Sequence, residues 1–151
     1  MKLQSIEMKG FKSFYRKTKI EFPEGIISIV GPNGSGKSNI LDAFRWVLGE
    51  QSAKSLRGER MDDVIFSGTK KHPQSNSCEV EIILDNSDGA IEVDFSQISI
   101  KRKTYRDGDT KYYINGKSCR LKDVRELFLD SGIGKEGYSI ISQGKIDEII
   151  N

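Results

Sequence analysis

Hydrophobic positions follow a period of two in much of the chain, which predicts a fold rich in β-strands. Polar and apolar residues alternate at 3–8 and again at 18–22, and both stretches are predicted strands. The run IISIV at 26–30 is apolar apart from one serine and rich in β-branched residues. Such a run is typical of a strand that is buried on both faces.

The segment from about 78 to 119 is predicted to form an antiparallel β-meander. Three strands are expected in it, at 78–84, 98–106 and 111–114. Residues 107–109 link the second and third strands as a hairpin. Asn115-Gly116 is the strongest hairpin signal in the chain, because both residues tolerate a positive φ.

Two segments show a helical period instead. Five apolar residues of ILDAFRWVLG, residues 40–49, fall on one helical face, and Gly49 ends this helix. A second amphipathic helix is expected at 121–130, with these residues facing inward: Leu121, Val124, Leu127 and Phe128. The combined pattern predicts an α+β fold, in which a mixed sheet packs around the first helix and continues into the meander.

A phosphate-binding motif lies between the buried strand and the first helix. Residues 31–38 read GPNGSGKS and match GxxxxGK[ST], the Walker A loop of P-loop proteins. Its glycines let the backbone N–H groups turn inward toward phosphate oxygens, and the helix that follows presents its positive end to them. Lys37 is expected to reach the β- and γ-phosphates, and the Ser38 hydroxyl to bind Mg²⁺.

The motif alone does not define the reaction. Phosphoryl transfer also needs a second carboxylate for Mg²⁺ and a residue that orients water. The best match to a strand ending in such a carboxylate is EIILD at 81–85, but the turn sequence at 86–89 favours a structural role. The chain therefore looks catalytically incomplete by itself.

Charge is distributed unevenly along the chain. The net charge is +2, yet residues 101–125 hold nine basic and three acidic residues, which makes this segment +6 and the remainder −4. The excess suggests a polyanionic partner, although charge alone favours a solvated strand surface. Cys78 and Cys119 are expected to be free thiols, and without a signal peptide or an apolar span we expect a cytoplasmic protein and no membrane.

Three segments resemble bacterial SMC (structural maintenance of chromosomes) proteins. They are LQSIEMKGFKSF near the start, the extended loop GPNGSGKSNILDAFRWVLGEQSAKSLRGERMDDVIFSG, and GYSIISQGKIDEII at the end. The resemblance implies an ABC-type ATPase head, of which residues 1–151 are the N-terminal lobe with the Walker A and Q-loop segments. The coiled coil, the hinge and the C-terminal lobe, with its signature and Walker B motifs, are then absent from this chain.

The resemblance also implies a function and partners. The complete head would bind ATP and Mg²⁺ and hydrolyse ATP when two heads engage, while this lobe alone would be inactive. Hydrolysis would drive DNA binding, chromosome condensation and segregation in the nucleoid. The implied partners are the chain's own C-terminal lobe, a second copy through hinge and heads, a kleisin with accessory subunits, and double-stranded DNA.

Individual roles follow from the same resemblance. The phosphate cradle would consist of Pro32, Asn33, Gly34, Ser35, Gly36, Lys37, Ser38 and Asn39, with Lys12 and Ser13 close to the nucleotide. Lys37, Arg57 and Gln143 would be catalytic, Arg57 as an arginine finger and Gln143 as a ligand of Mg²⁺ beside Ser38. Arg60, Arg120 and Lys122 would converge on a DNA-phosphate surface. From the residues alone, Arg57 and Gln143 read as ordinary loop residues.

Two other function classes remain open at this point. An ABC transporter subunit shares the Walker A and Q-loop arrangement and carries an aromatic residue before the loop, and Phe11, Phe14, Tyr15 and Phe22 satisfy that condition here. The FKSF and SLRG segments favour the SMC interpretation. A small P-loop kinase needs a lid and an acceptor site, for which the sequence offers no obvious segment.

Overall fold

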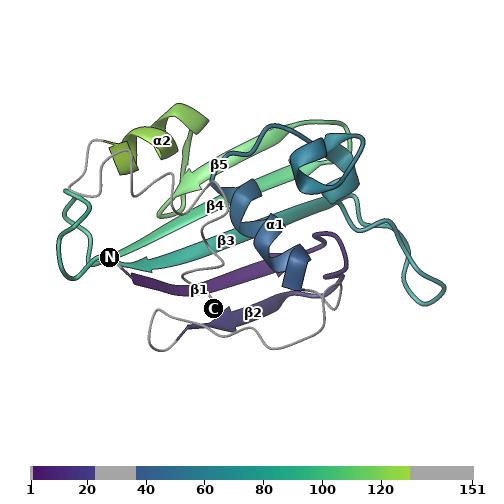
Figure 1. Cartoon of the computed structure of the whole chain (residues 1–151), viewed down its shortest axis with the longest axis horizontal. Helices are drawn as coiled ribbons and strands as arrows, with labels where there is room; N and C mark the ends of the chain where they lie inside the picture. The colour runs from purple at the N-terminus through teal and green to yellow at the C-terminus, as the bar shows by residue number, and fades with distance from the viewer. Residues whose placement is uncertain (1, 23–36, 130–151) are drawn as a thin grey trace.

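An antiparallel sheet of six strands forms the centre of the structure (Figure 1). The structure is a computed structural model, and it describes residues 2–22 and 37–129. The strand order is β2-β1-β3-β4-β5-β6, and every described pair is antiparallel. The strands are β1 (Lys2–Lys9), β2 (Thr18–Glu21), β3 (Ser77–Asp85), β4 (Gln97–Tyr105), β5 (Thr110–Ile114) and β6 (Lys117–Cys119).

Helix α1 (Lys37–Val47) crosses one face of the sheet, and α2 (Leu121–Leu129) lies beside β5 (Figure 1). Between α1 and β3 the chain forms two short 3-10 helices, η1 (Lys54–Leu56) and η2 (Met61–Val64). Within these described residues, no helix is long and apolar enough to cross a membrane. The α+β prediction is confirmed, and the strand expected at 26–30 lies outside the described residues.

Alternation along the strands explains which face of the sheet is buried. In β3 every second residue is buried, and Val80 and Ile82 are fully so. They face α1, whose inward side chains include Phe44 and Val47, both fully buried. Trp46 on α1 packs against Phe11 after β1, with ring centroids 5.3 Å apart. Burial of this apolar surface on α1 and the sheet drives the packing of the two layers.

The meander forms as predicted, and its last turn has the expected backbone. Asn115 and Gly116 have φ values of 49° and 79°, so both residues adopt the left-handed conformation that a tight hairpin requires. The Asn115 side chain also accepts a hydrogen bond from the amide of Ser99 at 2.7 Å, which ties the turn to β4. Val124 of α2 is fully buried, as expected for its inward face.

The structure corrects the interpretation of the basic 101–125 segment at one residue, Arg102. It belongs to the basic 101–125 segment, but its side chain is on the buried face and is only 1% exposed. It donates to the carbonyls of Trp46 (2.8 Å) and Glu50 (2.9 Å), and its guanidinium lies 4.6 Å from the Trp46 ring centroid. Burial lowers the pKa of Arg102. Arg102 therefore links the end of α1 to the meander and takes no part in a surface for polyanions.

Candidate nucleotide-binding site

Three segments distant in sequence meet at helix α1. They are the loop after β1, which carries Lys12 and Ser13, the first two turns of α1, and the end of η1, which carries Arg57. Asn39 and Asp42 lie three residues apart on α1 and therefore share one face of the helix. The expected neighbours of the nucleotide, Lys12, Ser13, Asn39 and Arg57, are connected through this face.

The centre of the contact is the carboxylate of Asp42. Its Oδ2 accepts hydrogen bonds from Lys12 Nζ at 2.6 Å, from Arg57 Nη2 at 2.6 Å and from Arg57 Nε at 3.0 Å. The Asp42 side chain is only 4% exposed. A buried carboxylate requires compensation by charge and hydrogen bonds, and the two cations supply both.

Asn39 extends this contact toward the start of the helix. Its Oδ1 accepts from Arg57 Nη2 at 2.9 Å, and its Nδ2 donates to Ser13 Oγ at 2.8 Å. Lys12 Nζ also donates to the backbone carbonyl of Leu56, the residue before Arg57. Hydrogen bonds therefore tie the loop after β1 and the end of η1 to α1 and to each other.

The backbone around these residues is held in unusual conformations. Lys12 has a φ of 49° and Arg57 a φ of 62°, in the left-handed region that costs non-glycine residues roughly 1–3 kcal/mol. Neighbouring hydrogen bonds maintain the Lys12 loop: Lys12 N donates to Val64 O, and Phe66 N donates to Gly10 O, both at 2.7 Å. Both cations on Asp42 thus come from strained positions, a feature that clusters at functional sites.

These residues suit an anionic ligand such as a polyphosphate. Lys12, Asp42 and Arg57 together carry a formal charge of +1, next to the first turns of α1, where the helix dipole is positive. Arg57 is 52% exposed, and its Nη1 has no hydrogen-bond partner among the described residues. A phosphate oxygen could therefore bind Arg57 without displacing Asp42.

The other residues that are predicted to bind the nucleotide either flank this contact or lie outside the described residues. Lys37 and Ser38 are the first two residues of α1, and Ser38 is partly exposed there. Residues 32–36 and Gln143 lie outside the described residues. Their roles in phosphate and Mg²⁺ binding stay predictions.

Asp85, at the end of the EIILD segment, has the structural role that the sequence favoured. It pairs in register with Lys2, whereas Glu79 at the start of β3 pairs with Lys9. Asp85 therefore lies at the far end of the sheet from the Lys12 loop. Its Oδ1 accepts from the amide of Ser87 at 2.8 Å and so stabilises the turn after β3.

The three predicted DNA-binding residues form two groups. Arg120 and Lys122 flank the first residue of α2, whereas Arg60 immediately precedes η2. Arg60 and Arg120 are well exposed, and each has a neighbouring carboxylate: Arg60 Nε is 3.2 Å from Asp62, and Arg120 Nε is 3.5 Å from Asp123. The three residues thus belong to two separate elements, and their role on DNA stays a prediction.

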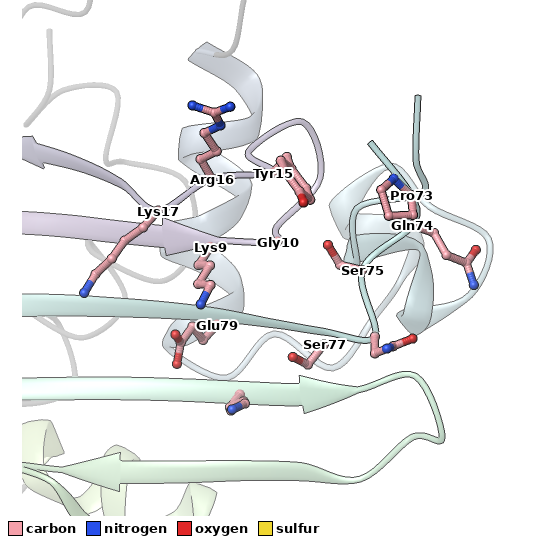
Figure 2. A pocket seen from close by; sticks show the side chains of 12 residues that line it. Lys9, Gly10, Tyr15, Arg16, Lys17, Pro73, Gln74, Ser75, Ser77 and Glu79 are labelled. Atoms are coloured by element: carbon pink, nitrogen blue, oxygen red, sulfur yellow. The ribbon is translucent and has the colours of Figure 1, made fainter. Parts of the chain in front are cut away.

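A separate pocket of about 600 Å³ opens on the other face of the sheet (Figure 2). Its charged lining residues are Lys9, Arg16, Lys17, Glu79 and Lys103. The three of these on strands, Lys9, Glu79 and Lys103, alternate with the buried residues that face α1, so they lie on the opposite face of the sheet from Asp42. The pocket shares no residue with the Asp42 contacts.

Sequence reasoning missed Asp42, the residue on which the contacts converge. Its position carries a signal: it follows Asn39 by three residues and Ser38 by four, which places it on the same face of the Walker helix. A second signal is its place in the sequence between two apolar residues, Leu41 and Ala43. An acidic residue at such a position requires a cationic partner.

A family model and the sequence relatives of this chain agree with one another. The model of the RecF/RecN/SMC N-terminal domain family matches residues 2–145. The chromosome partition protein Smc of Clostridium kluyveri is 57% identical over 151 residues, which are 100% of this chain and 13% of that protein. The chain therefore spans about 13% of the length of this curated relative.

Solved structures agree with the sequence relatives. One, described as "Structural biochemistry of ATP-driven dimerization and DNA stimulated activation of SMC ATPases", has a TM-score of 0.86 at 38% identity and covers 100% of this chain and 92% of that chain. Another is an SmcHead bound to the C-winged helix domain of ScpA. It has a TM-score of 0.86 at 39% identity, covering 98% of this chain and 46% of that chain.

Proposed function

The chain belongs to the family of RecF/RecN/SMC N-terminal domains, and from this premise we propose that it is the ATP-binding lobe of an SMC head. The observation that carries the proposal is the convergence of Lys12 and Arg57 on helix α1, where they contact Asp42 and, for Arg57, Asn39. This part of the helix directly follows the Walker A motif. An excess of positive charge beside a helix N-terminus is suited to the phosphates of a nucleotide.

Each residue has a defined task in this proposal. Lys37 and the backbone N–H groups of residues 32–36 hold the phosphates, and Asn39 and Ser13 line the edge of the cradle. Ser38 and Gln143 hold Mg²⁺, which when bound supplies charge neutralisation at the phosphates. Arg57 directs its guanidinium to the charge that develops during phosphoryl transfer, as a planar and permanently charged group can.

Hydrolysis in this proposal needs a second lobe. EIILD ends in a turn, so the second carboxylate must come from elsewhere, and we assign it to the C-terminal lobe of the same protein. The related structure concerns ATP-driven dimerization, which supports head-to-head engagement as the active state. Residues 1–151 thus form half of one catalytic head.

The cellular role follows from the relatives. We infer that ATP-dependent engagement of two such heads serves chromosome partition and DNA condensation in the nucleoid, as part of a homodimer joined at a hinge. The related Smc protein is named for chromosome partition, and a related SmcHead binds ScpA, which supports a kleisin partner for this protein as well.

Reconstitution of hydrolysis tests the function directly. The chain 1–151 alone should bind ATP without turning it over, and addition of the C-terminal lobe should restore turnover in a manner that depends on head dimerisation. In the restored head, Arg57→Ala should slow hydrolysis more than it weakens binding. Turnover by the isolated chain at a kinase-like rate, roughly 1 s⁻¹ or more, would contradict the proposal.

A further inference from the structure

The buried carboxylate of Asp42 and the side-chain oxygen of Asn39 together hold the guanidinium of Arg57. Asp42 Oδ2 contacts both Nε and Nη2, the two nitrogens on one edge of the guanidinium. Two contacts on one edge restrict rotation about the terminal bonds of the side chain, which a single contact does not do. The remaining nitrogen, Nη1, is then directed away from Asp42.

Asp42 itself is held rigidly enough to set that direction. It lies within α1, its side chain is 4% exposed, and Lys12 Nζ occupies the same oxygen at 2.6 Å. The Lys12 side chain is only 13% exposed, whereas Arg57 is 52% exposed. Lys12 therefore acts as the buried counter-charge of Asp42, and Arg57 is the cation with a side that remains accessible.

The charge balance leaves room for a ligand at Arg57. One carboxylate neutralises one of the two cations, so the positive charge that remains is placed at the accessible side of the cluster. Arg57 also occupies a left-handed backbone conformation, with its N–H donating to Lys54 O at 3.0 Å. Arg57 therefore reaches α1 from a strained backbone conformation.

From these contacts we propose that Asp42 is a positioning residue, which orients the guanidinium of Arg57 toward the phosphates without touching the nucleotide. The inference rests on the nucleotide-binding function proposed above and adds a residue to it. Asp42 acts on the rate of hydrolysis through Arg57, while phosphate binding depends mainly on the Walker A loop. Preorganisation of a charged donor lowers the barrier because no reorientation is needed during the reaction.

Asp42→Asn in the complete protein, with its C-terminal lobe, tests this role. The change keeps the size of the side chain and removes its charge. Hydrolysis should fall roughly tenfold to a hundredfold, while the affinity for ATP changes by less than about threefold. Glu79→Gln is the matched control, because Glu79 forms a 3.1 Å ion pair with Lys101 on the other face of the sheet. The hydrolysis rate and the affinity for ATP should both be unchanged in this control.

A double-mutant cycle separates positioning from general support of the fold. Once Asp42→Asn is present, Arg57→Ala should cause little further loss of hydrolysis, because the guanidinium is already misdirected. Additive losses would overturn the inference. An equal fall in affinity and hydrolysis for Asp42→Asn would also overturn it, since that result indicates a structural role only.

Arg57→Lys provides the same test without altering a buried group. Lysine keeps the charge at this half-exposed position but cannot place two nitrogens on Asp42 Oδ2. Its hydrolysis rate should match that of Arg57→Ala, and a wild-type rate would refute positioning by Asp42. Failure of the wild-type protein to bind ATP would instead reject the proposed function, so the two failures are distinguishable.

Discussion

Gly10 shows how one residue places the Lys12 loop. Its φ is +66°, and a Cβ at this position would lie 2.5 Å from the backbone oxygen of Ser77, closer than atoms can approach. Its own carbonyl accepts from the amide of Phe66 at 2.7 Å, which anchors the turn into Lys12. Both the conformation and the close approach to β3 therefore require glycine here.

We predict that Gly10→Ala lowers the free energy of unfolding more than Gly89→Ala does. Gly89 has nearly the same φ, +68°, but no atom lies within 4 Å of the place that an alanine methyl group would take, so only the conformational cost of about 1–2 kcal/mol applies. Gly10→Ala should lose roughly a further 1–3 kcal/mol from overpacking. Urea unfolding of both variants measures the difference, and equal losses would show that the Ser77 contact is not restrictive.

At the residue scale, the structure shows a connection among Lys12, Asn39 and Arg57 that the sequence does not predict. Lys12, Ser13, Asn39 and Arg57 were assigned through resemblance to a family, because nothing in the spacing from Lys12 to Arg57 indicates contact. Asp42 was overlooked, since an acidic residue on an amphipathic helix is usually solvated. Only the tertiary structure shows that its carboxylate is buried between two cations.

At the scale of elements, α1 and the meander are joined by Arg102. The sequence places this arginine in the most basic segment, yet its alternation with Ile98 and Ile100 assigns it to the buried face of β4. The pattern of burial therefore gives a better guide to Arg102 than its charge does. Its hydrogen bonds to Trp46 O and Glu50 O fix the end of α1 and the start of the segment that leads to Arg57.

Arg102→Met should destabilise the chain by about 2–4 kcal/mol, because two buried backbone carbonyls are each deprived of a charged donor. Lys103→Met is the control on the same strand, since Lys103 points to the other face and should cost about 0.5 kcal/mol or less. Thermal unfolding of the two variants measures the effect. Equal stability of both variants would show that the Arg102 hydrogen bonds contribute little.

The described strands and helices agree with their sequence patterns, whereas the order of the strands does not follow from those patterns. Period-two alternation predicted the meander, and the Asn115-Gly116 turn predicted its last hairpin. The central place of β1, between β2 and β3, depends on pairing across more than 70 residues. Local propensity carries no information about such distant pairing.

At the scale of the whole molecule, the arrangement of basic residues predicts how DNA binds the complete head. We expect Arg120→Glu with Lys122→Glu to weaken duplex binding, and Arg60→Glu to weaken it independently, because the two groups belong to different elements, α2 and η2. Binding of a cation to a DNA phosphate releases counterions. The slope of log affinity against log salt should therefore become shallower by about 0.9 for each phosphate that is no longer neutralised.

Gel-shift titrations at two salt concentrations measure this effect. Lys70→Glu with Lys71→Glu is the matched control, because both lysines are exposed and the charge change equals that of the α2 pair. Nucleotide affinity should stay nearly constant in all variants, since screening acts over about 10 Å at 0.1 M salt. Unchanged DNA affinity in the Arg60 and α2 variants at low salt would place the DNA surface elsewhere.

Calorimetry with ATP and Mg²⁺ measures directly whether this chain binds ATP through its Walker A loop. The wild-type chain should bind one nucleotide, and Lys37→Ile should lower the affinity by roughly a hundredfold or more, because each charge-assisted hydrogen bond contributes about 1.5–3 kcal/mol. Lys70→Ile, at an exposed position in the loop before β3, should bind like wild type. Equal ATP affinity of the wild-type and Lys37→Ile chains would contradict the account.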